Sequence, residues 1–507
     1  MAEFQDVFGN TNWERSDFSN MLFSSNEYNT ETNEVTSPSG DDVFGSLRDY
    51  YDTMSNGDLT ITGQILNDPL PGGDTPDWIR LSHDKIWYRN NSYWYLYNEA
   101  VDSADARGYD VSTGSTTKLV IIYAGNFYLS NLNPRNLGSS YIMYERWKGR
   151  GADNYDDGPN GDNDTTSPFG HIGVHAHEFG HFFWGFDLYN SPNTIVDWSL
   201  MGDACDLGGT VQGGFNTRGS CPGPINPELR RRKGWITVHD LTSDSLDANL
   251  PYSEATPTVY RRQIDTNEYF LIENRRFQNY SRFLPGYTLG HGGGMMIWHV
   301  TGTTAAIYLE RADNVTDGDY YNGEPNDIFP GPTVDNHNFN TTTTPNSNRF
   351  DGAVSHFAVN SISEPASTMT ADFCINYWSG DITSNTTWTS ANSPYYVGGD
   401  VVVSSGVILS IQSGTKVIFI ADTDNQSGGL DNTLSELTIE GKIEADGVTF
   451  TSTVHSSGKW YGVVLDNADN NSYIENCTIE YAVYGISTNN TDLTIEQSTI
   501  KNNSGNG

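Results

Sequence analysis

The chain has 507 residues, a formal net charge of −37 and four cysteines, which together exclude several classes of protein. Proteins that bind nucleic acids or anionic membranes carry clustered Lys and Arg, so the acidic balance argues against both kinds of partner. No apolar run approaches the ~20 residues of a transmembrane helix, and four cysteines are too few for a fold built on disulfides. The length allows two or three domains.

Residue usage favours a secreted or cell-surface protein. Lys is scarce, whereas Asn, Asp, Ser, Thr, Gly and Tyr are abundant, as in extracellular β-rich proteins. The start at Met1 has neither the basic segment nor the apolar core of a signal peptide, so we expect that a signal is missing from this sequence. Cys205 and Cys221 could close one loop in an oxidising compartment, but spacing alone leaves that disulfide open.

Helical and strand patterns follow one another through the first 240 residues. Apolar side chains at helical spacing indicate helices, and runs of β-branched and aromatic residues indicate strands. This order predicts an α/β layer with a helix around His177 packed on a twisted sheet. The predicted elements are a helix from Asp41 or Asp42 to Met54, a strand at 59–63, a helix at 93–107, and strands at 118–124 and 139–145.

An acidic segment precedes the helix around His177 and is a candidate calcium site. Carboxylate oxygens are the hard ligands that Ca²⁺ prefers. The spacing is not that of an EF-hand, so a solvated acidic loop is the alternative. The candidate ligands are Asp153, Asp156, Asp157, Asp162 and Asp164.

The stretch HEFGHFFWGFD, from His177 to Asp187, carries the strongest chemical signal. Residues i and i+4 of a helix lie on one face, so His177 and His181 can bind one ion, with Glu178 beside it. Two neutral imidazoles and a carboxylate that takes a proton from water are what a zinc hydrolase requires. Asp187 would be the third ligand, and Glu178 the general base. The alternative is a buried amphipathic helix whose histidines only form hydrogen bonds.

Two neighbouring features bear on this motif. The extended metzincin pattern HExxHxxGxxH/D has glycine where this chain has Trp184, and Gly185 follows. Either the turn is displaced by one residue or Trp184 adopts another geometry, because a left-handed turn is unfavourable for a bulky residue. Met201 stands where a methionine turn would lie beneath the metal, and we expect it to pack rather than bind zinc. His171 and His175 are expected to lie at the surface or to support the ligands, rather than to bind the metal themselves.

Several ordered stretches together resemble the immune inhibitor A family of secreted bacterial zinc metallopeptidases. The resemblance covers roughly residues 1 to 375. The stretches are Asp49-Tyr-Tyr51 with Ser55-Asn-Gly57, Val174 to His181, Asp187-Leu-Tyr189, Ser199-Leu-Met-Gly202, Pro227-Glu-Leu229, Lys233-Gly-Trp235, Phe270 to Arg275, Leu284-Pro-Gly286 and Met296-Ile-Trp-His299.

The resemblance implies a metzincin-like α+β peptidase domain with zinc held by His177, His181 and Asp187. Glu3 to Val7 resembles the end of the family's first strand, but the apolar run that usually precedes it is missing. We therefore expect a fragment that lacks its first strand and exposes a sheet edge. The segment at 139–145 is a candidate for binding substrate backbone by strand addition, by analogy with metzincins.

Beyond residue 240 the pattern becomes one of short strands. The pattern of residues 241–376 predicts a β-rich subdomain that packs against the catalytic unit. Glu273 and His299 in this subdomain are expected to be structural groups. From 377 to 507 charge falls, and Ile474-Glu-Asn-Cys-Thr-Ile479 matches Ile495-Glu-Gln-Ser-Thr-Ile500 at an offset of 21 residues. Short strands at such a period indicate coils of a parallel β-helix, here truncated.

Taken together, the sequence predicts a zinc-dependent endopeptidase that hydrolyses extracellular proteins or peptides. The predicted domains are 1–240, a metzincin-like peptidase; 241–376, the β-rich subdomain; and 377–507, the β-helix. The alternative is a catalytically silent surface adhesin or glycan-binding protein that uses the β-helix. The intact HExxH motif together with Asp187 argues against it, because a silent domain has no need of Glu178.

Overall fold

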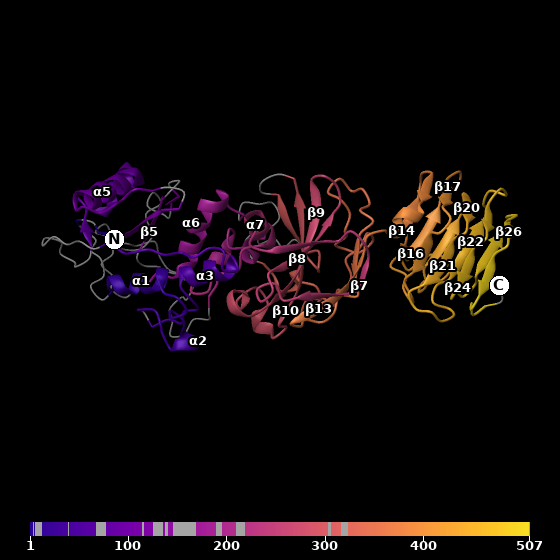
Figure 1. Cartoon of the computed structure of the whole chain (residues 1–507), viewed down its shortest axis with the longest axis horizontal. Helices are drawn as coiled ribbons and strands as arrows, with labels where there is room; N and C mark the ends of the chain where they lie inside the picture. Colours follow the sequence, from indigo (N-terminus) through magenta and orange to yellow (C-terminus); the bar gives the residue numbers. More distant parts are fainter. Residues whose placement is uncertain are drawn as a thin grey trace.

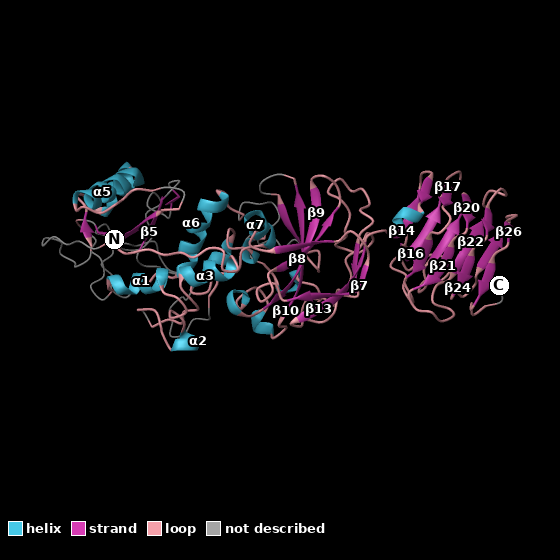
Figure 2. Ribbon diagram, in the orientation of Figure 1, coloured by secondary structure: helices cyan, strands magenta, loops and turns pink. Residues whose placement is uncertain are grey.

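The computed structural model describes most of the chain, in three consecutive parts (Figure 1). The residues described are 1–3, 5, 13–38, 40–66, 78–113, 116–124, 135–136, 140–144, 169–188, 195–208, 219–302, 306–315 and 323–505. Helices gather in the first part, and strands dominate the other two (Figure 2). The described chain is therefore β-rich. No helix within it is both long and apolar enough to cross a bilayer.

The first part places helices around a five-stranded sheet of order β2-β1-β3-β5-β4. All pairings are parallel except that of β4 with β5. The two residues of β1 lie between β2 and β3 and pair with both, so β1 is not an exposed edge of this sheet. The elements are β1 (Ala2–Glu3), α1 (Arg15–Phe23), α2 (Thr30–Asn33), α3 (Leu47–Met54), β2 (Ile79–Arg80), α4 (Lys85–Asn91), α5 (Tyr93–Ala106), β3 (Leu119–Tyr123), β4 (Arg135–Asn136), β5 (Ser140–Tyr144), α6 (Ile172–Trp184), η1 (Val196–Trp198), η2 (Asp203–Asp206) and α7 (Pro227–Lys233).

The predicted helix at 93–107 and the predicted strands at 118–124 and 139–145 are confirmed as α5, β3 and β5. The helix expected from Asp41 or Asp42 is confirmed only in part, because α3 begins at Leu47. Ser46 is its N-cap: its hydroxyl accepts from the Asp49 amide at 3.0 Å, and the Asp49 carboxylate accepts from the Ser46 amide at 3.1 Å. This capping box fixes the start of the helix.

One other expectation about the first part is wrong, and the pairing of β5 bears on another. Residues 59–63 join no sheet in the described structure, although they were expected to form a strand. The outer side of β5 is not free along its length, because Arg135 pairs with Ile142 and Asn136 with Tyr141. Addition of a substrate strand to β5 would have to displace this pairing.

The second part contains two sheets over a shared core of Leu, Ile, Met and Phe side chains. One sheet has the order β11-β10-β9-β8-β6 and the other β12-β13-β7. The strands are β6 (Thr237–Asp240), β7 (Ser245–Pro251), β8 (Thr258–Gln263), β9 (Glu268–Arg276), β10 (Gly293–Thr301), β11 (Ile307–Glu310), β12 (Ala358–Asn360) and β13 (Thr368–Cys374), with short 3-10 turns η3 (Asn279–Ser281), η4 (Tyr287–Leu289) and η5 (Pro325–Asp327).

The third part is a β-helix-like stack of parallel strands around its own apolar core. Its ladders run β15-β17-β20-β23-β26, β14-β16-β19-β22-β25 and β16-β18-β21-β24-β27, and β16 is long enough to serve two of them. The strands are β14 (Tyr377–Ile382), β15 (Thr386–Trp388), β16 (Tyr395–Val403), β17 (Ile408–Ile411), β18 (Lys416–Phe419), β19 (Glu436–Ile439), β20 (Lys442–Asp446), β21 (Thr449–Ser452), β22 (Gly462–Asp466), β23 (Tyr473–Glu475), β24 (Thr478–Glu480), β25 (Ile486–Asn489), β26 (Thr494–Glu496) and β27 (Thr499–Lys501), with η6 (Ser390–Asn392) between β15 and β16.

The predicted match of the two sequence repeats is confirmed, since Ile474 stacks on Ile495 and Ile479 on Ile500. The period near twenty does not hold for every coil: Thr386 stacks on Leu409, 23 residues away, but the next coil is longer. Val401 stacks on Leu437, 36 residues away, because a loop is inserted between β18 and β19.

Candidate metal centre

Helix α6 carries three of the predicted site residues on one face. The ring centroids of His177 and His181 lie 5.0 Å apart, as expected for positions i and i+4. His177 and Glu178 are buried, and one nitrogen or oxygen from each of His177, Glu178 and His181 lies within 4.8 Å of the others. One turn of helix therefore brings two imidazoles and a carboxylate together.

The helix ends one residue later than the metzincin pattern places its glycine. Gly185 has φ 71°, in the left-handed region, and its amide donates to the carbonyl oxygen of His181 at 3.1 Å. Trp184 stays helical, and its indole nitrogen donates to the Leu229 carbonyl oxygen of α7 at 3.3 Å. The turn is thus displaced by one residue, the first of the two alternatives. The residue that needs the left-handed conformation is still a glycine.

Asp187 then folds back onto both histidines. Its Oδ1 lies 3.0 Å from Nε2 of His177 and 3.1 Å from Nε2 of His181. Ligands of a tetrahedral zinc ion with bonds of about 2.0–2.1 Å lie about 3.3 Å from one another. The donor atoms therefore converge at close to the required spacing, and two imidazoles with one carboxylate are a donor set that suits zinc.

The segment at Trp198–Gly202 supports this centre through its backbone. The Leu200 carbonyl oxygen lies 2.9 Å from Nδ1 of His177, so Nδ1–H donates there and Nε2 faces Asp187. Such a partner on the far nitrogen fixes ring orientation in metal sites. The Met201 carbonyl oxygen accepts from the Leu188 amide at 2.7 Å, directly after Asp187.

Met201, the residue predicted to belong to a methionine turn, packs against α6. Its side chain is fully buried, and a Cβ added at Gly180 would come within 2.5 Å of its sulfur. A larger residue at position 180 would push the helix and its histidines away from the turn. On the neighbouring side, the Tyr51 hydroxyl donates to the Ala176 carbonyl oxygen at 2.6 Å.

The protonation of the cluster follows from its contacts. Burial raises the pKa of Asp187, but hydrogen bonds from His177 and His181 outweigh it and hold that pKa well below its usual value. Burial lowers the pKa of His177, but its hydrogen bonds to Asp187 and Cys205 hold that pKa well above its usual value. A proton on His177 thus offsets the negative charge of Asp187, as a metal cation would, and metal binding would release that proton.

Cys205 is the nearest thiol to the centre and was expected in another role. It is a free cysteine, as is Cys221, so the disulfide left open by the sequence is not formed. Burial raises the pKa of the Cys205 thiol to about 11. It therefore stays a neutral partner of His177 at neutral pH rather than a thiolate ligand.

The other histidines of the motif region are not surface groups. His171 and His175 are both buried, at 5% and 2% exposure. Burial lowers the pKa of His175 to about 3, so it is neutral at physiological pH. His171 is the N-cap residue of α6, and its Nε2 lies 3.6 Å from the Asp41 carboxylate.

Charged groups of the second part are paired, as expected for Glu273 and His299. His299 lies between Glu268 and Glu310, at 2.9 Å from each. Glu273 accepts from Arg275 at 2.5 Å. A second carboxylate–histidine group, Asp335 with His337 and Glu364, lies at the surface. The predicted calcium ligands Asp153, Asp156, Asp157, Asp162 and Asp164 lie outside the described residues.

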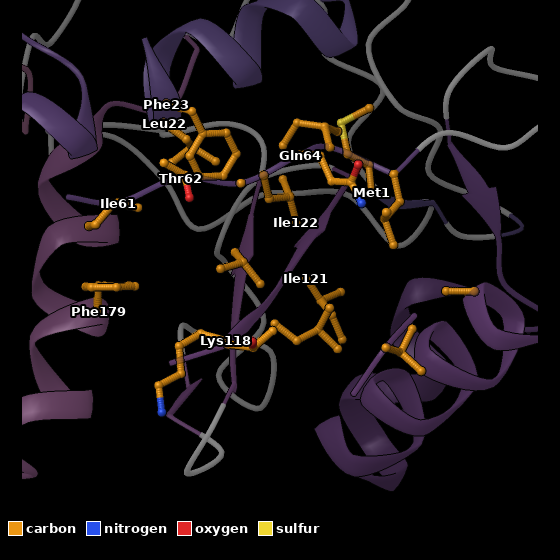
Figure 3. A pocket seen from close by; sticks show the side chains of 18 of the residues that line it. Met1, Leu22, Phe23, Ile61, Thr62, Gln64, Lys118, Ile121, Ile122 and Phe179 are labelled. Carbon is orange, nitrogen blue, oxygen red and sulfur yellow. The ribbon is translucent and has the colours of Figure 1, made fainter. Parts of the chain in front are cut away.

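A cavity of about 440 Å³ lies beside α6 but is separate from the candidate metal centre. Figure 3 shows Phe179 of α6 and Ile61 on one side, and Ile121 and Ile122 of β3 on another. None of His177, Glu178, His181 or Asp187 is among its lining residues. It therefore belongs to the space between the helix and the sheet.

Comparison with known proteins does not assign the chain to a family: no family model matches the chain, and no curated protein matches it. The geometry of the centre therefore has to carry the functional argument. Three contributors were missed by sequence reasoning, namely the Leu200 carbonyl, Tyr51 and Cys205. A backbone carbonyl leaves no residue-type signal, and neither Tyr51 nor Cys205 is near α6 in the sequence.

Proposed function

We propose that the chain is a zinc-dependent endopeptidase that hydrolyses extracellular proteins or peptides. The observation that carries the proposal is the convergence of Asp187 Oδ1 on Nε2 of His177 and His181, at 3.0 and 3.1 Å. The resemblance to the immune inhibitor A metallopeptidases supports the same conclusion, as does the position of Met201 beneath the helix.

His177, His181 and Asp187 would hold the ion and leave a fourth position for substrate. Zinc bound there would supply a water with a pKa of about 7 and a positive charge for the scissile carbonyl oxygen. Leu200 keeps the His177 ring oriented through Nδ1, and the turn at Gly185 keeps Asp187 in reach.

Glu178 is the general base of the proposed reaction. Its carboxylate is buried beside both imidazoles, within 4.8 Å of a ligand nitrogen of each. It is placed to accept a proton from the attacking water and to pass that proton to the leaving amine. In this mechanism Glu178 acts on water beside the three ligands.

The experiment compares casein hydrolysis by zinc-loaded wild type, Glu178→Gln and the exposed control Glu440→Gln. Loss of the general base should lower the rate by about 10²–10⁴-fold while zinc content stays at the wild-type level. Glu440→Gln should behave as wild type. Hydrolysis by Glu178→Gln at the wild-type rate would refute the mechanism, and a zinc-loaded wild type without activity would favour the adhesin alternative.

A further inference from the structure

Two buried carboxylates lie on neighbouring strands of the β-helix-like part. Asp400 ends the first half of β16, and Glu436 begins β19. Val401 pairs with Leu437, so the residues just before them occupy equivalent positions of successive coils. Asp400 is 5% exposed and Glu436 1% exposed. Like charges stacked in this way repel each other and are unfavourable unless something compensates them.

The loop between β18 and β19 closes over this pair. The Leu430 amide donates to Glu436 Oε1 at 2.7 Å, and the Glu436 amide donates to Asp400 Oδ1 at 3.2 Å. A Cβ added at Gly429 would lie 2.2 Å from Glu436 Oε1 and 2.7 Å from Asp400 Oδ2. Both carboxylates therefore lie against the loop backbone at Gly429. Glu436 Oε1 and Asp400 Oδ2 lie at most 4.9 Å apart.

One oxygen in this group has no partner. Oε2 of Glu436 is buried and accepts no hydrogen bond within the described structure. The ion pairs of the described residues give neither Asp400 nor Glu436 a basic partner. Lys459, which contacts the loop, is paired with Asp422 at 2.6 Å. A buried carboxylate without a cation or a full set of donors carries a large desolvation cost.

More negative charge surrounds the pair. Burial, followed by the charges of Asp424 and Asp431, raises the pKa of Asp400 to about 6. Burial raises the pKa of Glu436 to about 7, and the charges of Asp400 and Asp424 add to this. The surroundings thus favour either an added proton or an added cation.

We propose that Asp400 and Glu436 bind a calcium ion beneath the loop 421–435. This site is distinct from the zinc and calcium sites expected from the sequence. Oxygens up to about 5 Å apart can share one Ca²⁺ at bond lengths of about 2.3–2.6 Å. Loop carbonyls and water complete the seven or so ligands that calcium accepts. Magnesium suits this site less, because it requires near-ideal octahedral geometry that an irregular loop rarely provides.

Binding would stiffen the loop that reaches the start of the β-helix-like part. The Asn425 side chain donates to the Tyr377 hydroxyl, and the Asn425 amide donates to the Gly398 carbonyl oxygen at 3.2 Å. Tyr377 packs with Cys374 of β13. The ion would therefore hold the inserted loop against the junction between the second and third parts.

The test is equilibrium dialysis of the full, zinc-loaded chain against ⁴⁵CaCl₂ in chelator-free, metal-depleted buffer. Glu436→Gln and Asp400→Asn should each bind one calcium fewer per chain than wild type, whatever other calcium sites exist. The exposed control Glu496→Gln, on β26, should keep the wild-type stoichiometry. Equal stoichiometry in wild type and both site variants would overturn the proposal.

Hydrogen exchange separates calcium binding from a merely structural role. In 5 mM CaCl₂ the amides of residues 421–436 should exchange about tenfold more slowly in wild type, but not in Glu436→Gln. Without calcium, Glu436→Gln should exchange no faster than wild type, because it removes one of two repelling charges. Faster exchange in calcium-free Glu436→Gln, with no calcium effect in wild type, would instead show that the carboxylates share a proton.

Discussion

The Gly185 amide donates to the carbonyl oxygen of His181 at 3.1 Å, and this bond ends α6 one residue later than the metzincin pattern places its glycine. The displacement leaves Trp184 helical and still brings Asp187 to both histidines. The conformation of the turn, rather than the position of the glycine in the motif, is what sets the third donor in place.

Gly185→Ala should weaken zinc binding. A side chain at φ 71° costs about 1 kcal/mol, which corresponds to about fivefold in affinity if the closed turn bears the strain. The control is Gly234→Ala, because Gly234 ends α7 at φ 76° and, like Gly185, has open space for a Cβ. Competition with a fluorescent zinc chelator measures both. Equal affinity in the two variants would contradict this role of Gly185.

Met201 should support the helix by packing. Met201→Ala removes a fully buried side chain beneath Gly180 and should lower the free energy of unfolding by about 2–5 kcal/mol. Met201→Leu conserves volume and should cost less than about 1.5 kcal/mol. Urea unfolding followed by tryptophan fluorescence gives both values, and Met201→Leu should keep its zinc. A Leu variant that folds normally but loses zinc would show that the thioether itself matters.

A buried ion network in the second part should be sensitive to loss of one charge. Arg275 is fully buried between Glu254, at 3.5 Å, and Glu273, at 2.5 Å. Arg275→Met leaves those carboxylates uncompensated and should cost about 3–5 kcal/mol. The matched control Arg261→Met breaks a solvent-exposed pair with Asp240 and should cost less than about 1 kcal/mol. Similar losses in both variants, measured by urea unfolding, would argue against the network.

Asp327 should make stability fall as pH rises. Burial raises its pKa to about 6, from 3.8 in an unfolded chain, and Arg311 offsets this only in part. A raised folded-state pKa means that its contribution is complete below pH 3.8 and is lost as pH rises through 6. The loss is about 3 kcal/mol. Between pH 4 and pH 7 the wild-type free energy of unfolding should fall by about 2 kcal/mol through this carboxyl, because the carboxyl of the unfolded chain is already about half ionised at pH 4. Asp327→Asn should lack this part of the pH difference. An unchanged pH difference in the variant would contradict this assignment.

Local sequence signals predicted the elements whose stabilisation is local. The apolar spacing of 93–107 and the β-branched run at 118–124 became α5 and β3. The start of α3 was misplaced because two aspartates at 41 and 42 offered plausible caps, whereas the reciprocal bonds of Ser46 and Asp49 determine the true one. Whether 59–63 pairs in a sheet depends on distant strands, which its alternation could not show.

The β-helix-like part shows a second limit of periodicity. Ile474 and Ile495 are a true stacked pair, and their offset reveals the architecture. An inserted loop separates Val401 from Leu437 in sequence but not in space, so an earlier coil has no regular period. At the candidate metal centre, the i and i+4 spacing predicted the proximity of His177 and His181. The Leu200 carbonyl that orients His177 could not be found without the fold.

The most direct test of the account is to measure bound zinc and casein hydrolysis on the same samples. Wild type should contain one zinc per chain, lose activity when a chelator removes it, and regain activity when zinc is returned. Asp187→Ala should bind zinc at least about tenfold more weakly, because the ion loses one of its protein ligands. Activity that persists without zinc, or zinc content that does not depend on Asp187, would contradict the central claim.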